Sequence, residues 1–331
     1  MAGIIILAVS AAWISVKQVA VHTAENRARQ ILTITESDDP DTFIRNTTAY
    51  VFEHFTRADP SENFSLKIRS LVTHPSLPEF IRLPDGVIET LIETGMCDNA
   101  GRYLAFVLQQ AGYESVQWNM VTPHGAHAAR LVTYPDTNKT AVLADPYFGF
   151  VLSDRSGHLT HPKVAKRIAH RGYPFDKTFI ALSPESDPRF YQHFKDVSMS
   201  AQGEPLIISA TLPKIRKPLY MGKIDSDDKD VKNKTKSLGM SPNWNYIGHR
   251  YEREWVRILK APQDMHLEIT LVSGNSPHTG TIDPPPAVDG KNLSWDLKAG
   301  DKITFYDGRA HIALPSFKSY TIIDQIAVFP E

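Results

Sequence analysis

The chain has 331 residues, 42% of them hydrophobic and 22% charged, values typical of a globular protein whose length favours two domains. Its 36 basic and 37 acidic residues leave a net charge of −1, which gives no electrostatic reason to expect a nucleic-acid partner. The single cysteine excludes an intrachain disulfide framework and any metal site built on several thiolates.

The N-terminal segment is apolar over the length of a membrane span. The residues from Ala2 to Val21 include one charge, Lys17, and a helix of this length reaches roughly 30 Å, the thickness of a bilayer core. A cleaved signal peptide and a buried helix are the alternatives, although neither a basic n-region nor a clear cleavage site accompanies the segment. We therefore expect residues 1–22 to be a single-pass membrane anchor or a signal. Basic residues follow the segment rather than precede it, which by the positive-inside rule favours a cytoplasmic body.

Helical patterns dominate the following part of the chain. Asp41 is the expected N-cap of a helix that carries apolar residues at helical spacing, and Gly112 supplies the stop signal of the helix that follows Cys97. The expected helices cover residues 22–37, 39–57, 84–95 and 97–112.

Strand patterns follow Gly112. Residues 115–121, 127–134 and 140–145 read as strands, and "PDTNK" between the last two has the composition of a turn. From about Leu206 onward short strands recur between turn signals, without any long helical period, which is typical of an antiparallel β-sandwich. The chain is therefore expected to be an α+β protein, with one domain over residues 23–200 and a sandwich over residues 205–331.

Cys97 occupies the start of a predicted helix. Unpaired amides and the helix dipole favour negative charge there, and the thiolate is the reactive form of cysteine. The same amides could hold an oxyanion, whereas the neighbouring charge of Asp98 opposes a thiolate unless that side chain caps the helix. The structural alternative is a small, inert, buried residue, which is the commoner role of a lone cysteine.

His127 and Asp145 are expected to be neighbours. They stand at equal distances from position 136 in the predicted turn, and residues symmetric about a hairpin turn face each other about 5 Å apart. A nucleophilic cysteine needs a base and the base needs an orienting group, so this pair could complete a Cys–His–Asp triad. Alternatively, His127 is a satisfied core residue and Asp145 starts a turn.

The stretch from Thr48 to Val151 resembles the transglutaminase-like superfamily. The similar motifs are "GMCDNAGRYLAFVLQQAGY", "HAARLVTY" and "LADPYFGF", although Ala129 and Leu131 stand where the family often has an aromatic and an acidic residue. The resemblance implies a papain-like domain in which Cys97 is the nucleophile, His127 the base and Asp145 its orienter, and it slightly favours an extracytoplasmic location.

Two classes of function are open at this stage. The first is a thiol enzyme that acts on amide bonds of a peptide or protein without any cofactor, with hydrolysis favoured over cross-linking because water is always present. Trp118 could line its cleft, although a core aromatic is the commoner role. His124 is a second candidate for the base or for substrate binding, less favoured as the base because Gly125 places it in the preceding turn. The second is a degenerate scaffold whose sandwich binds a partner or a glycan through aromatics in "SPNWNYIGHRYEREW". A metal site of His124, His127, His158 and His161 has little support, because no second cysteine or HExxH motif is present.

Overall fold

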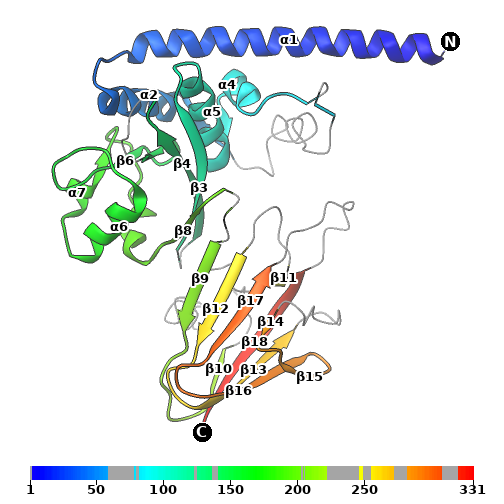
Figure 1. The fold of residues 1–331 in the computed structure, drawn as a ribbon, viewed down its shortest axis with the longest axis vertical. Helices are drawn as coiled ribbons and strands as arrows, with labels where there is room; N and C mark the ends of the chain where they lie inside the picture. The colour runs from blue at the N-terminus through cyan, green and yellow to red at the C-terminus, as the bar shows by residue number, and fades with distance from the viewer. Residues whose placement is uncertain are drawn as a thin grey trace. The chain divides into compact units, whose positions relative to one another are not determined.

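The computed structural model describes residues 2–58, 78–79, 82–122, 125–135, 141–202, 204, 206–221, 246–248, 255–271, 282–307 and 320–331. Side chains are described from residue 13 onward, except those of residues 125, 196, 246–248, 255, 306–307 and 320–324. The chain forms two compact units. The first comprises residues 1–118 and 127–195, and the second comprises residues 119–126 and 196–331. Figure 1 shows helices and strands together in the first unit and strands throughout the described part of the second.

The first unit packs its N-terminal helices over a mixed set of strands. Its helices are α1 (Ala2–Thr35), α2 (Pro40–His54), α4 (Val87–Ile92), α5 (Cys97–Gln109), α6 (Pro162–His170) and α7 (Phe175–Thr178), followed by the 3-10 helix η1 (Tyr191–Asp196). Its strands are β1 (Thr56–Arg57), β2 (Thr94–Gly95), β3 (Glu114–Thr122), β4 (Gly125–Thr133), β5 (Val142–Asp145), β6 (Phe150–Leu152) and β7 (Phe179–Ala181). The main sheet has the order β7-β6-β5-β4-β3-β8, where β8 is Ser198–Ala201, and β1 pairs with β2 separately.

One hydrophobic core joins the helices of the first unit to its sheet. α1 contributes Ala24, Ala28 and Ile31 at helical spacing, and the sheet contributes residues such as Val132 and Val142. α1 is one continuous helix, whereas the sequence pattern predicts a separate helix from residue 22. Within the described residues no helix is long and apolar enough to cross a membrane, so the anchor expected over residues 1–22 has no support from them.

The helix boundaries correct one prediction. Asp39, not Asp41, caps α2, because its Oδ2 accepts a hydrogen bond from the Thr42 amide at 2.9 Å and Pro40 takes the first helical position. Asp41 lies inside the first turn, where its buried carboxylate accepts hydrogen bonds from the Tyr134 hydroxyl and the Leu159 amide. Asp41 therefore joins α2 to the sheet rather than starting the helix.

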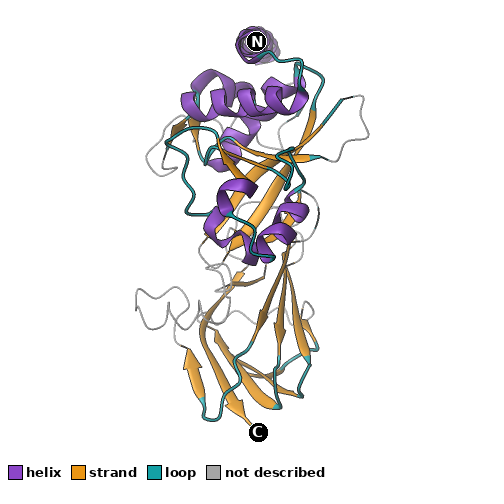
Figure 2. Ribbon diagram, turned by 90° about the vertical axis from the view of Figure 1, so that its left-hand side faces the viewer, coloured by secondary structure: helices purple, strands orange, loops and turns teal. Residues whose placement is uncertain are grey.

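The second unit is built of two sheets that share a core (Figure 2). Its strands are β9 (Leu206–Thr211), β10 (Leu219–Met221), β11 (Tyr246–Gly248), β12 (Trp255–Lys260), β13 (Met265–Leu271), β14 (Ile282–Asp283), β15 (Ala287–Asp289), β16 (Asn292–Leu297), β17 (Lys302–Asp307) and β18 (Tyr320–Pro330). The orders are β10-β18-β13-β16-β15, with β11 also on β18, and β14-β17-β12-β9.

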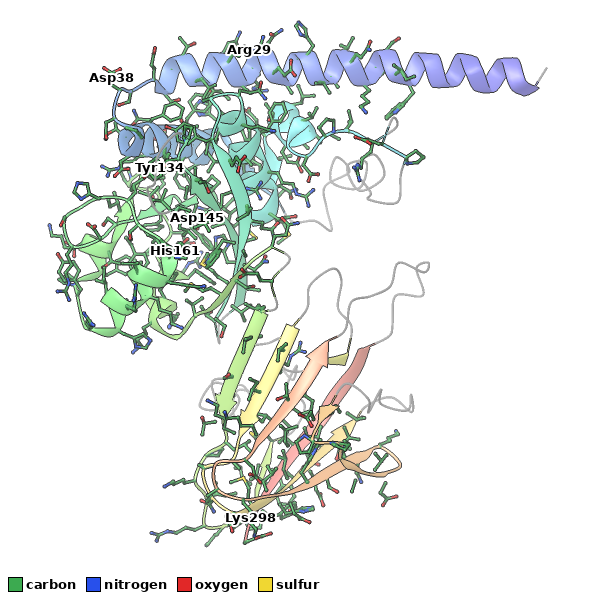
Figure 3. The ribbon with its side chains drawn as sticks, in the orientation of Figure 1. Arg29, Asp38, Tyr134, Asp145, His161 and Lys298 are labelled. Carbon is green, nitrogen blue, oxygen red and sulfur yellow. The ribbon has the colours of Figure 1, made fainter. Side chains whose placement is uncertain are left out.

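Alternating burial confirms the β-sandwich character of this unit and corrects one detail. In β13 every second residue from Met265 is buried in the shared core. The pair β9–β12, however, is parallel, with Leu206 opposite Trp255, so the sandwich is not wholly antiparallel. Lys298 lies at the surface of this unit and pairs with Asp264 and Glu331 (Figure 3). The fold class is thus α+β.

Candidate active site

The start of α5 is held in place by its own side chains. Gly95 has φ +149°, a region that favours glycine, and its missing Cβ leaves room for the Asn99 side chain. Asn99 Oδ1 accepts a hydrogen bond from the Met96 amide at 2.9 Å, which fixes the chain as it enters the helix. The N-cap of α5 is Met96, not Asp98. The Asp98 carboxylate Oδ2 lies 4.0 Å from a guanidinium nitrogen of Arg102, one turn along the helix.

Cys97 is the first residue of α5 and is a half-buried free thiol. The first helical hydrogen bonds are donated by the amides of Asn99 and Ala100 to the Met96 carbonyl. The amides of Cys97 and Asp98 precede these bonds, so they are the helix-terminal donors that have no helical acceptor. They belong to the residue that carries the sulfur and to its neighbour, so they are the candidate donors to an oxyanion if Cys97 attacks a carbonyl.

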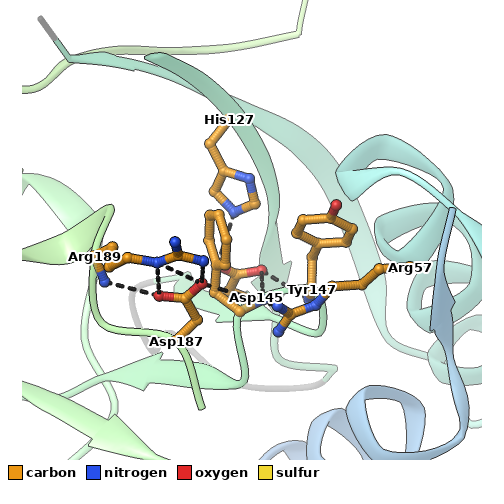
Figure 4. Close-up of polar contacts among 7 residues, drawn as sticks. Arg57, His127, Asp145, Tyr147, Asp187 and Arg189 are labelled. Atoms are coloured by element: carbon orange, nitrogen blue, oxygen red, sulfur yellow. Dashed lines mark hydrogen bonds and ion pairs between the residues drawn. The ribbon is translucent and has the colours of Figure 1, made fainter. Parts of the chain in front are cut away.

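His127 and Asp145 form a hydrogen-bonded pair in the interior of the first unit (Figure 4). The His127 Nε2 lies 2.7 Å from Asp145 Oδ2, and the two side chains are 2% and 0% exposed. The neighbouring hairpin register pairs Arg130 with Ala144, two residues away from Val142, its partner in the symmetric arrangement. The predicted adjacency of the two side chains is therefore confirmed, whereas their catalytic roles stay a prediction.

The carboxylate of Asp145 accepts four hydrogen bonds. Oδ2 accepts from His127 and from the Tyr191 hydroxyl at 2.6 Å. Oδ1 accepts from the amides of Tyr147 at 2.9 Å and Phe148 at 3.2 Å. Burial raises the pKa of Asp145, but the charge of His127 and these hydrogen bonds outweigh it, so the pKa lies below its ordinary value and the group is ionised.

The imidazole of His127 is enclosed by aromatic rings. Its centroid lies 4.4 Å from that of Phe148 and 5.0 Å from that of Phe190. Burial lowers the pKa of His127, but the charge and hydrogen bond of Asp145, followed by a hydrogen bond to Cys97 and the charge of Cys97, raise it to about 10. The imidazole is therefore a cation at neutral pH, and with Nε2 bound to Asp145 its Nδ1 is the nitrogen left for the sulfur.

The other predicted site residues have different outcomes. Trp118 is only 2% exposed; its ring meets the edge of the His161 ring at 5.3 Å and the Lys163 ammonium at 5.8 Å. Within the described part of the chain, its indole Nε1 has no hydrogen-bond partner. Figure 3 labels His161 in the same unit as Asp145. Trp118 is thus a buried residue rather than part of an open wall. His124 lies outside the described residues, as do Trp244 and Tyr251 of the aromatic segment that is a candidate for glycan binding.

Sequence reasoning missed the groups that surround His127 and Asp145. The Tyr191 hydroxyl binds Asp145 although the two residues are 46 positions apart in the sequence. The Phe190 ring contacts His127, and the Arg57 guanidinium lies over the ring of Phe148. In "DPYFGF" the aromatic pair that directly follows the Asp and Pro is the available signal for Phe148. No comparable signal marks Tyr191. Among the described side chains, no group of three or more His, Cys, Asp or Glu is arranged to hold a metal ion.

Comparisons with known proteins identify no family. No family model matches the chain, and no curated protein matches it. A similar solved structure is that of Aeromonas hydrophila PliG, a periplasmic lysozyme inhibitor of g-type lysozyme, with 11% sequence identity and a TM-score of 0.18. The match covers 38% of this chain and 98% of that one. At this level of similarity it carries no argument about fold or function.

Proposed function

We propose that this protein is a thiol enzyme of the transglutaminase-like type, which acts on amide bonds of peptide or protein substrates. Cys97 is the nucleophile, His127 the base and Asp145 the group that orients the imidazole. The observation that carries the proposal is the chain of contacts from Cys97 to the buried His127 and on to Asp145, at the first turn of a helix.

The geometry suits acyl transfer to sulfur. The Cys97 thiolate attacks the amide carbon, and the imidazolium of His127 gives its proton to the departing amine, which leaves an acyl-enzyme thioester. The amides of Cys97 and Asp98 are the donors available to the oxyanion of each tetrahedral intermediate. Water then attacks the thioester and His127 accepts its proton. The C–S bond breaks, the carboxylic acid leaves, and the Cys97 thiolate and the protonated His127 are restored.

The state of His127 supports this assignment. A protonated imidazole is a proton donor beside the sulfur of Cys97 at the first turn of a helix, as acyl transfer to a cysteine requires. Asp145 holds the cation by charge and by a 2.7 Å hydrogen bond, and Tyr191 fixes the carboxylate in turn. Hydrolysis remains the favoured outcome over cross-linking, since cross-linking needs a site that keeps water out.

Alkylation with iodoacetamide tests the proposal without a known substrate. Because the chain has one cysteine, a single mass adduct on the folded protein reports Cys97 alone. We expect rapid modification at neutral pH. In His127→Ala the rate should fall by about tenfold or more, since the imidazolium is then absent. Cys97→Ser is the blank, and His158→Gln, which changes an exposed histidine, is the matched control.

The results separate an enzyme from a scaffold. A wild-type protein that reacts no faster than His127→Ala would contradict the proposal and favour a degenerate domain. For the reactive protein, incubation with a peptide mixture and a fluorescent primary amine distinguishes the reactions: new peptide termini indicate hydrolysis, and incorporation of the amine indicates transamidation. Both activities must be lost in Cys97→Ser.

A further inference from the structure

We infer that Arg57 recognises the substrate of this site by binding a carboxylate close to the scissile amide. The inference deepens the proposed function and rests on it, because it takes Cys97 as the reacting group. It assigns a role to a cation that the triad itself does not use.

Strand pairing brings Arg57 to the nucleophile. β1 and β2 are parallel, with Arg57 opposite Gly95, and the Ala58 amide donates a hydrogen bond to the Gly95 carbonyl at 3.0 Å. Gly95 is two residues before Cys97 in the sequence. Arg57 is therefore fixed by main-chain contacts beside the segment that leads into α5.

Aromatic rings hold the guanidinium of Arg57 (Figure 4). Its central carbon lies 5.2 Å from the ring centroid of Tyr147, 5.6 Å from that of Phe52 and 5.7 Å from that of Phe148. Such contacts stabilise the cation through the faces of the rings and leave N–H groups at the edge of the guanidinium for a ligand. The rings therefore orient the guanidinium but do not use its N–H donors.

The charge of Arg57 is incompletely matched within the described part of the chain. Its nearest carboxylate oxygen there is Asp187 Oδ2 at 3.9 Å, beyond hydrogen-bond distance. Arg189 already holds Asp187 through hydrogen bonds of 2.6 to 3.1 Å to both oxygens. The Arg57 side chain is 37% exposed, so an incoming anion can reach it.

The aromatic platform connects Arg57 to the triad. Phe148 lies under Arg57 and also contacts the ring of His127, and the main chain of Tyr147 and Phe148 binds Asp145. Burial raises the pKa of Tyr147, the charge of Cys97 raises it further and the charge of Arg57 lowers it. Tyr147 and Phe148 thus contact Arg57 with their rings and Asp145 with their main-chain amides.

A carboxylate is the group that this arrangement fits. The planar fork of arginine matches two carboxylate oxygens with parallel hydrogen bonds, and it is more weakly hydrated than a lysine ammonium. In a peptide the group can come from the C-terminus or from an acidic side chain beside the scissile bond. Both sources present the same chemistry to Arg57.

Two alkylating reagents of almost equal size test the inference. Iodoacetamide is neutral and iodoacetate is an anion, and each transfers its methylene carbon to the Cys97 sulfur with loss of iodide. We expect the ratio of the iodoacetate rate to the iodoacetamide rate to fall about tenfold in Arg57→Gln, because the anion loses its charge-assisted hydrogen bonds. Arg57→Lys should retain part of the preference, and Arg171→Gln, which changes an exposed arginine at the end of α6, should retain all of it.

The outcomes keep the inference and the proposed function apart. An unchanged ratio in Arg57→Gln, with normal iodoacetamide reactivity, overturns the role of Arg57 and leaves the thiol enzyme intact. A wild-type protein that iodoacetamide does not label overturns the proposed function. If Arg57→Gln does not fold by circular dichroism, the comparison of Arg57→Lys with wild type decides, and an unchanged ratio there overturns the inference.

Protection of Cys97 by dipeptides then separates the two sources of the carboxylate. Ala-Ala with a free C-terminus, Ala-Glu with an amidated C-terminus and Ala-Ala amide are added before iodoacetamide. Protection by the first alone supports a C-terminal carboxylate, and protection by the second alone supports an acidic side chain. Protection by the neutral amide as strong as by the acids, or by none of the three, contradicts the inference.

Discussion

The buried carboxylate of Asp145 is stable only because its surroundings satisfy it. An ionised carboxylate in an aromatic interior loses its hydration, and an unpaired charge there costs several kcal/mol. His127, Tyr191 and two backbone amides replace that hydration with four hydrogen bonds. The same bonds restrict the carboxylate to one orientation, so His127 is held in one orientation as well. The four hydrogen bonds to Asp145 thus fix both the carboxylate and the orientation of the imidazole.

The raised pKa of His127 predicts how stability depends on pH. The folded protein holds the His127 proton up to a pKa of about 10, whereas the ordinary value is near 6.5. The folded state therefore binds more protons between these values, and the stability from this group, fully present below about pH 6.5, is lost as pH rises towards 10. The pKa of Asp145 is lowered in the folded protein, so its contribution to stability is fully present above its ordinary pKa of about 3.8. That contribution is lost as the pH falls from 3.8 through the lower pKa of the folded state.

Thermal unfolding across pH measures this contribution. We expect the difference in melting temperature between wild type and His127→Gln to be largest between about pH 4 and pH 6.5 and to shrink towards pH 10. His158→Gln should follow the wild-type profile. A difference that is constant from pH 6 to pH 10 would contradict the assignment of a cationic His127.

At the scale of elements, the turn before α5 sets the position of the nucleophile. Gly95 is opposite Arg57 on one side and packs against the capping side chain of Asn99 on the other. Gly95 is thus the last residue of β2, and it contacts the first turn of the helix that begins with Cys97. A change at Gly95 is transmitted to Cys97 because only Met96 separates them.

Gly95→Ala is expected to damage both stability and reactivity. An added Cβ would lie 2.5 Å from Asn99 Oδ1 and 2.6 Å from Asn99 Cβ, so the cap must move. We expect the free energy of unfolding to fall by about 2 kcal/mol, through backbone strain and loss of the cap. The iodoacetamide rate at Cys97 should fall about tenfold, since the thiol no longer meets His127 correctly.

Gly112→Ala provides the matched control at the other end of α5. Gly112 has φ +80°, but a Cβ added there would have no atom within 4 Å, so this variant has strain without a clash. It should lose less stability than Gly95→Ala and keep the wild-type alkylation rate. Equal effects of the two variants would mean that the contact with Asn99 does not position Cys97.

Local signals in the sequence predict the elements better than they predict their partners. The apolar spacing after Cys97 indicates a helix, which ends at Gln109, and symmetry about a turn brings His127 to Asp145. Both depend on short-range periodicity. The parallel pair β9–β12 and the contact of Tyr191 with Asp145 depend on which distant segments meet, and a single sequence carries no local signal for that.

At the scale of the whole molecule, the described residues form two hydrophobic cores, and one strand passes from the first compact unit into the second. β3 belongs to the first unit up to Trp118 and to the second from Asn119. Val121, on the later part of β3, is 3% exposed and belongs to the core of the second unit. The hairpin that carries His127 is therefore connected through its own chain to the packing of the β-sandwich.

Val121→Ala tests whether that packing supports the hairpin. Removal of two buried methyl groups should lower the free energy of unfolding by about 2 kcal/mol, measured by urea denaturation with tryptophan fluorescence. Val116→Ala is the matched control on the same strand, because Val116 is 46% exposed, and we expect a change below about 0.5 kcal/mol. If the hairpin depends on this core, the iodoacetamide rate at Cys97 in Val121→Ala falls at a lower urea concentration than in Val116→Ala. At that concentration Val116→Ala still reacts at its full rate. Equal stability of the two variants would mean that the core of the second unit does not depend on β3.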